Sequence, residues 1–273
     1  MRVETTRGEG DWVYARARPE ALTPWVDHLW TFRGPTADRF KRVFPNGCLE
    51  LIVSFEGAYR VEGFSLEAAA VSGLSAGPLV VEQPPAQDVM AARLTPAGAR
   101  ALLGVPMESL AHRHLALEDL IGASARELRE RAAGLGVERR LHALAGWLRA
   151  RLSPPPRDAA SWMVEALVES RGCASIEALR LEAGFSKRRL LASFRERVGL
   201  TPKRYARVLR FHRALTTLQG AAPGARLIEV AHAAGFYDQA HMNAEFRALG
   251  GLTPSAFLDA RHPVGDGSTA ADR

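Results

Sequence analysis

The stretch EVAHAAGFYDQAHMNAEFRALGGLTPSAF, residues 229–257, decides the fold of the C-terminal half of the chain. Gly235 stands where a first helix must end abruptly, because a left-handed residue at a helix end costs little only for glycine. The apolar residues after it recur at helical spacing and predict a second helix with one inward face: Met242, Phe246 and Leu249. Thr253 and Pro254 then supply an N-cap and a proline in the first turn of another helix.

The same unit occurs earlier, in EAGFSKRRLLASFRERVGLTPKRY, residues 182–205. Its Thr201-Pro202 pair opens a long helix that we expect over roughly 203–219. A short helix, a tight turn and a second helix form the helix-turn-helix plan, in which the second helix enters the major groove. Residues 179–213 hold eleven Lys and Arg against two Asp and Glu, a net charge of +9. Such a local positive field attracts polyanions, although a solvated arginine-rich face is the plain alternative.

Two copies of the unit limit the alternatives. A helical solenoid generally needs three or more repeats to be stable, and only two are present. A single copy is equally compatible with a helical hairpin that only packs. Two copies joined by a long helix favour a DNA-binding domain over that reading.

Region 160–260 resembles the DNA-binding domain of AraC/XylS-type transcription regulators, which has two helix-turn-helix units joined by a linker helix. The resemblance is carried by AGFSKRRLLASFRERVGLTPKRY and by the stretch at 229–257. It implies a sequence-specific transcription regulator that binds double-stranded DNA. RNA polymerase, a homodimer partner and a small-molecule effector are further partners that it allows. The N-terminal part, with RVFPNGCLELIVSF, more loosely resembles a β-rich sensor domain found ahead of such domains.

The resemblance also implies roles for individual residues. The predicted base contacts are Lys187, Arg188, Leu191, Ala192, Gln239, Ala240, His241, Asn243 and Ala244. The predicted phosphate contacts are Arg189, Arg195, Lys203 and Arg204, and we expect Arg207 and Arg210 on the same phosphate-facing or solvated surface. The predicted turn and core residues are Gly184, Phe185, Leu190, Phe194, Gly235, Phe236, Met242 and Phe246.

Three positions depart from the usual pattern of the family. Leu191 and Ala192 are apolar where polar or basic residues are common, and Ala244 is small where an arginine often sits. We therefore interpret the first recognition helix chiefly as an anchor, which either reads bases or holds only phosphates. Arginine pairs with guanine and glutamine with adenine, so Arg188 and Gln239 are the leading candidates for base readout.

The predicted fold class is α+β: an N-terminal β-rich sheet or small barrel with helices, followed by an all-α domain. Short apolar runs with Gly and Pro between them predict strands from residue 10 to about 95, and helices follow from Pro96. The predicted domains are a sensor or dimerisation domain at 1–153, a proline linker at 154–158, the DNA-binding domain at 159–262 and a disordered tail at 263–273. The three prolines of the linker cannot continue a helix.

Composition excludes several classes of protein. The 273 residues contain no apolar run long enough for a membrane span and begin without a secretory signal, so the expected location is cytoplasmic. Cys48 and Cys173 do not form a disulfide framework. We expect no cofactor and no metal, and we interpret the HRH motif at 112–114 as a solvated loop. No catalytic motif stands out, so we do not expect an enzyme. The competing interpretations are a module that docks an acidic protein and a metabolite-binding protein whose helical units do not read DNA.

Overall fold

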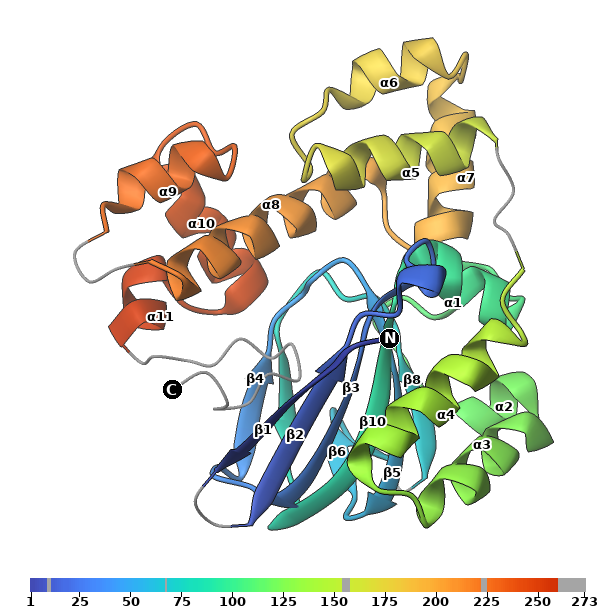
Figure 1. Ribbon diagram of the computed structural model, residues 1–273. Coiled ribbons are helices and arrows are strands. Elements are labelled where there is room, and N and C mark those ends of the chain that lie inside the picture. The colour runs from blue at the N-terminus through green and yellow to red at the C-terminus, as the bar shows by residue number, and fades with distance from the viewer. Residues whose placement is uncertain (9–10, 67, 154–157, 222–224, 260–273) are drawn as a thin grey trace.

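The computed structural model describes residues 1–8, 11–66, 68–153, 158–221 and 225–259. A β-rich N-terminal part precedes a helical part that lies over one end of it, which confirms the predicted fold class (Figure 1). The predicted linker, apart from Asp158, and the predicted tail at 263–273 lie outside the described residues. None of the described helices combines the length and the apolar character that crossing a membrane requires.

Two antiparallel sheets form the N-terminal part. The larger has the strand order β1-β2-β3-β10-β5-β8-β11 and the smaller has the order β4-β9-β6-β7. The strands of the larger sheet are β1 (Val3–Gly8), β2 (Trp12–Ala17), β3 (Val26–Pro35), β10 (Ala86–Leu94), β5 (Leu49–Glu56), β8 (Ala69–Ser72) and β11 (His114–Ala116). Those of the smaller sheet are β4 (Phe40–Val43), β9 (Leu79–Glu82), β6 (Tyr59–Val61) and β7 (Phe64–Leu66). The sheet therefore begins before residue 10, earlier than predicted.

Helices cover one face of the larger sheet. The helices of this part are α1 (Pro96–Leu103), α2 (Leu117–Ile121), α3 (Ala123–Ala133) and α4 (Val137–Arg149), with short 3-10 turns at Glu20–Leu22 and Met107–Ser109. Arg140 of α4 is fully buried and donates to the Asp88 carboxylate on β10, with Nη2 and Oδ2 3.1 Å apart. Its guanidinium also lies 3.8 Å from the centre of the Phe55 ring. The buried ion pair therefore ties α4 to the middle of the sheet.

The described residues of the C-terminal part form seven helices. They are α5 (Ala159–Glu169), α6 (Ile176–Glu182), α7 (Lys187–Val198), α8 (Pro202–Gln219), α9 (Leu227–Ala233), α10 (Gln239–Gly250) and α11 (Pro254–Asp259). The Thr201 hydroxyl caps α8 by accepting from the Arg204 N–H, as predicted from the Thr-Pro pair. Gly184 and Gly235 occupy the left-handed region, with φ of 66° and 83°, and end α6 and α9. The central helix α8 connects the two helix-turn-helix units (Figure 1).

The loop after β4 joins the two parts of the molecule. Phe44 is buried, and its ring centre lies 6.2 Å from that of Phe211 on α8 and 5.9 Å from that of Phe257 on α11. Gly47 has a φ of 83°, and its carbonyl accepts a 3.3 Å hydrogen bond from the Tyr205 hydroxyl on α8. The N-terminal part therefore contributes residues to the core of the helical part.

Candidate nucleic-acid interface and ligand pocket

Helix α7 turns one face inward and the other toward solvent. Its buried residues are Leu190, Phe194 and Val198. All four of its predicted base contacts are exposed: Lys187, Arg188, Leu191 and Ala192. Helix α1 and the 3-10 turn at 107–109 pack on the same helix, and Arg100 of α1 pairs with Glu196 at 2.8 Å. The N-terminal half of α7, which is the half that contacts bases in helix-turn-helix proteins, stays free of these contacts.

Helix α10 repeats the arrangement with different chemistry. Met242 and Phe246 are buried, while Ala240, His241 and Ala244 are exposed. The predicted base contacts Gln239 and Asn243 are half-buried. The Asn243 Oδ1 atom is buried and has no hydrogen-bond partner among the described residues. The helix therefore presents amide and imidazole groups where α7 presents cations.

The turn before α10 holds His241 in place. Its ring packs edge-on against Phe236, with the ring centres 5.3 Å apart. Its Nδ1 atom accepts from the Tyr237 N–H at 3.4 Å, so the neutral ring carries its hydrogen on Nε2. The Nε2 atom is the donor that remains for DNA.

The second turn is one residue longer than the first, which sequence reasoning missed. Helix α7 begins two residues after Phe185, whereas α10 begins three residues after Phe236. The extra residue is Tyr237, whose side chain is 86% exposed. The signal was present in the sequence as an unmatched aromatic residue when the two copies are aligned.

The basic residues divide between solvent and the interior. The predicted phosphate contacts Arg195, Lys203 and Arg204 are exposed, and the Arg189 guanidinium lies 4.5 Å from the Phe185 ring centre. The expectation for Arg207 and Arg210 was wrong, because both are engaged inside the domain.

Arg207 and Arg210 hold the linker helix to its neighbours. The Nε atom of Arg207 donates to both Glu245 carboxylate oxygens on α10, at 3.1 and 2.8 Å. Arg210 Nη1 donates to the Gly172 carbonyl at 2.7 Å. These bonds connect α8 to the second recognition helix and to the loop after α5.

A pocket lies between the two sheets, on the face of the larger sheet away from α3 and α4. It encloses about 930 Å³ when its open mouth is included. Alternate residues line it along six of the strands, as the two-residue period of a strand predicts: Trp30 and Phe32, Lys41 and Val43, Glu50 and Ile52, Tyr59 and Val61, Phe64 and Leu66, and Leu79 and Val81. On β8 the consecutive residues Ala70, Val71 and Ser72 all line it. The wall is therefore mainly aromatic and aliphatic, with few polar groups, as ligand pockets usually are.

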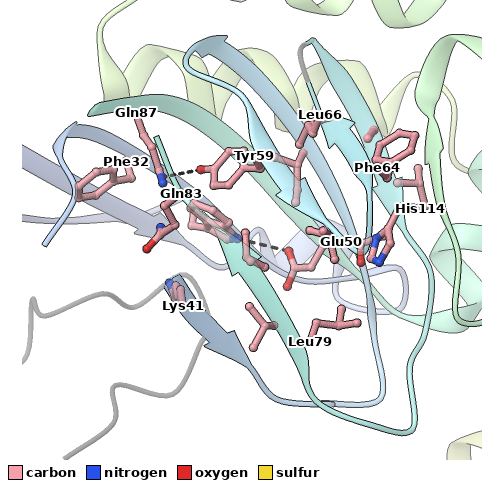
Figure 2. A pocket seen from close by; sticks show the side chains of 18 residues that line it. Phe32, Lys41, Glu50, Tyr59, Phe64, Leu66, Leu79, Gln83, Gln87 and His114 are labelled. Atoms are coloured by element: carbon pink, nitrogen blue, oxygen red, sulfur yellow. Dashed lines mark hydrogen bonds between the residues drawn. The ribbon is translucent and has the colours of Figure 1, made fainter. Parts of the chain in front are cut away.

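Polar groups stand at separate places in this wall (Figure 2). At one end the Tyr59 hydroxyl donates to Gln87 Oε1 at 2.6 Å. Glu50 accepts from Arg93 Nε at 2.6 Å and from Trp30 Nε1 at 3.3 Å. These side chains come from four strands, β6, β10, β5 and β3, so the packing of the two sheets assembles the site.

The HRH motif at 112–114 is only partly the solvated loop that we predicted. His114 lies in β11 and lines the pocket, 6.3 Å from Phe64 between ring centres. Burial lowers the pKa of His114, which favours its neutral form. Within the described part of the chain, no three His, Cys, Asp or Glu side chains converge as a metal site would require.

Two families match the sequence. Residues 16–116 match a domain of unknown function (DUF6597), and residues 181–260 match a helix-turn-helix domain. The second match covers both recognition helices and the linker helix. Residues 181–260 form an AraC-type helix-turn-helix domain, and the chain is a DNA-binding transcription regulator. The helical part is its DNA-binding domain.

Several solved structures are similar to this chain over most of its length. ToxT from Vibrio cholerae is 12% identical, with a TM-score of 0.48, over 85% of this chain and 97% of that one. Unsaturated fatty acid bound wild-type ToxT from the same species is 12% identical, with a TM-score of 0.46, over 92% and 97%. The AraC-like transcriptional activator CuxR is 14% identical, with a TM-score of 0.28, over 82% and 88%. No curated protein matches the sequence. These TM-scores are all below 0.5. The DNA-binding role of the chain therefore rests on the match to the helix-turn-helix domain.

Proposed function

We propose that the regulator reads DNA mainly with α10 and that α7 is chiefly an anchor, with Arg188 as its candidate base contact. The observation that supports this division is the chemistry of the two exposed faces. Helix α7 offers Lys187 and Arg188 beside apolar Leu191 and Ala192, which suits phosphates and thymine methyl groups. Helix α10 offers Gln239, His241 and Asn243, whose amides and imidazole can pair with base edges.

The test is selection of bound duplexes by the full chain, followed by affinity measurements over a range of salt concentrations. We expect a preferred site and an affinity that falls steeply as salt rises, because phosphate contacts release counterions. A salt-dependent affinity with no preferred sequence would reject base readout. An affinity that does not change with salt would instead favour the competing interpretation, a module that docks a protein.

We further propose that the pocket binds a small-molecule effector and that β4 and β9 transmit its presence. These two strands pair, with Val43 opposite Leu79, and both residues line the pocket. The residue after Val43 is Phe44, which packs on Phe211 and Phe257. The residue before Leu79 is Pro78, whose ring lies beside Gly251, the residue that follows α10.

An effector acts through this route only if it binds two arrangements of the DNA-binding domain with different affinity. The experiment is a thermal-shift screen of metabolites against the full chain, with each hit then tested for its effect on DNA affinity. The variant Val81→Trp fills the pocket and should abolish both the shift and the effect. Hits that stabilise the protein without changing DNA affinity would reject the coupling. The predicted contact with RNA polymerase, the homodimer and the cytoplasmic location stay predictions.

A further inference from the structure

Gln87 is a buried amide with an unused donor in the pocket wall. Its side chain lines the pocket, and the residue is 4% exposed. Its Nε2 atom has no hydrogen-bond partner among the described residues. A buried donor without a partner is destabilising, because it has lost its hydrogen bonds to water and gained none in return.

Tyr59 determines which end of the Gln87 amide is free. Burial is the main cause that raises the pKa of the Tyr59 phenol, with a further contribution from Asp88, so the phenol keeps its proton. A protonated buried phenol must donate, and the Gln87 oxygen lies 2.6 Å from the Tyr59 oxygen. The amide oxygen is thereby fixed toward Tyr59, and the buried NH₂ group is the donor left without a partner among the described residues.

The rest of the pocket wall favours an uncharged ligand. Lys41 and Glu50 are the charged lining residues, Glu50 is already paired with Arg93, Lys41 also has an interaction partner, and burial favours neutral His114. A carboxylate withdrawn from water costs far more than a carbonyl oxygen, and one amide donor compensates only the carbonyl. The aromatic rings of Trp30, Phe32 and Phe64 supply a large apolar surface for the remainder of the molecule.

We propose that the pocket selects an uncharged, largely apolar molecule with one carbonyl-type oxygen, which accepts a hydrogen bond from Gln87 Nε2. This inference rests on the proposed effector function of the pocket and specifies the chemistry of the effector. The aromatic and aliphatic wall supplies affinity, and Gln87 distinguishes the ketone, ester or amide from a hydrocarbon of the same shape.

The experiment compares three probes of similar size by calorimetry with the full chain: acetylnaphthalene, ethylnaphthalene and naphthoate. We expect the ketone to bind roughly tenfold more tightly than the hydrocarbon, the ratio that one well-placed hydrogen bond provides. The anion should bind more weakly than the ketone. In Gln87→Met the ketone should lose its advantage while the hydrocarbon still binds, which also shows that the variant keeps its pocket.

Each other outcome has a distinct meaning. Equal binding of ketone and hydrocarbon by the unmodified protein would overturn the role of Gln87 and leave the pocket as a ligand site. Tighter binding of naphthoate would overturn the uncharged class. Binding of none of the three probes would overturn the inference together with the proposed effector function of this pocket.

Discussion

At the scale of the residue, Arg188 and Gln239 begin the two recognition helices with different contact chemistry. Both belong to the first two positions of their helices, and their neighbours Leu190 and Met242 are buried. The packed helix therefore holds the Cα end of each side chain in place, and the other end is exposed. This geometry suits contacts that depend on which base is present.

We expect Arg188→Ala and Gln239→Ala each to relax the preference for one base pair, by about 1–3 kcal/mol. The reason is loss of a bidentate contact to a single base edge. The measurement is affinity for a panel of duplexes that differ at one position at a time. Lys203→Ala is the matched control, since removing a phosphate contact should weaken every duplex equally. If Arg188→Ala behaves like this control, α7 only anchors.

Tyr237 calls for a separate test, because nothing in the fold requires its aromatic ring. Its side chain is 86% exposed, so Tyr237→Ala should leave the melting temperature unchanged. If its hydroxyl donates to a phosphate beside α10, the same change should weaken DNA binding by about 1.5 kcal/mol for all sequences. Tyr237→Phe should reproduce that loss. Unchanged affinity in both variants would assign the residue no part in the interface.

At the scale of the element, the ion pair between Arg207 and Glu245 holds the linker helix to α10. Both side chains are partly buried, with exposed fractions of 30% and 12%. We expect a double-mutant cycle on the free energy of unfolding to give a coupling of about 1 kcal/mol. The exposed pair Arg226 and Glu229 is the matched control, with exposed fractions of 75% and 60%. A coupling no larger than in the control would mean that packing alone positions α10.

Helix boundaries were predictable because their signals are local. Thr201, Gly184 and Gly235 each determine a helix end through their own backbone or side chain, so a single sequence reveals them. The pocket was not predictable to the same degree. Tyr59 and Gln87 meet only because the two sheets pack against each other, and no local pattern specifies that packing.

The wrong expectation for two arginines has the same cause, a contact between residues far apart in the chain. Arg207 and Arg210 lie in a basic helix, and sequence alone cannot tell a solvated cation from one bonded to a distant partner. Glu245 is 38 residues away from Arg207, and Gly172 is 38 residues away from Arg210. Charge density was a sound guide to the surface as a whole but not to these two positions.

At the scale of the whole molecule, Phe44 packs the loop after β4 against Phe211 and Phe257 of the DNA-binding domain. We expect Phe44→Ala to loosen the two parts, because large aromatic side chains contribute about 3–5 kcal/mol where they are fully packed. Amide hydrogen exchange should then rise in α11 and in α8 around Phe211. The effect of any pocket ligand on DNA affinity should shrink at the same time.

Phe40→Ala is the control for that change, since Phe40 lies on β4, four residues before Phe44, and is 58% exposed. It should alter neither exchange nor coupling. Unchanged exchange in Phe44→Ala would show that other contacts between the parts suffice. A ligand effect that persists in full in Phe44→Ala would place the route of communication elsewhere.

The shared core around Phe44 also limits how such regulators can be recombined. A hybrid that joins these DNA-binding helices to a foreign sensor at the proline segment would leave the rings of Phe211 and Phe257 without their cover. Uncovered aromatic rings favour aggregation. A graft that also carries the loop 44–47 should express without aggregating. The junction that matters for protein engineering is therefore this loop rather than the linker.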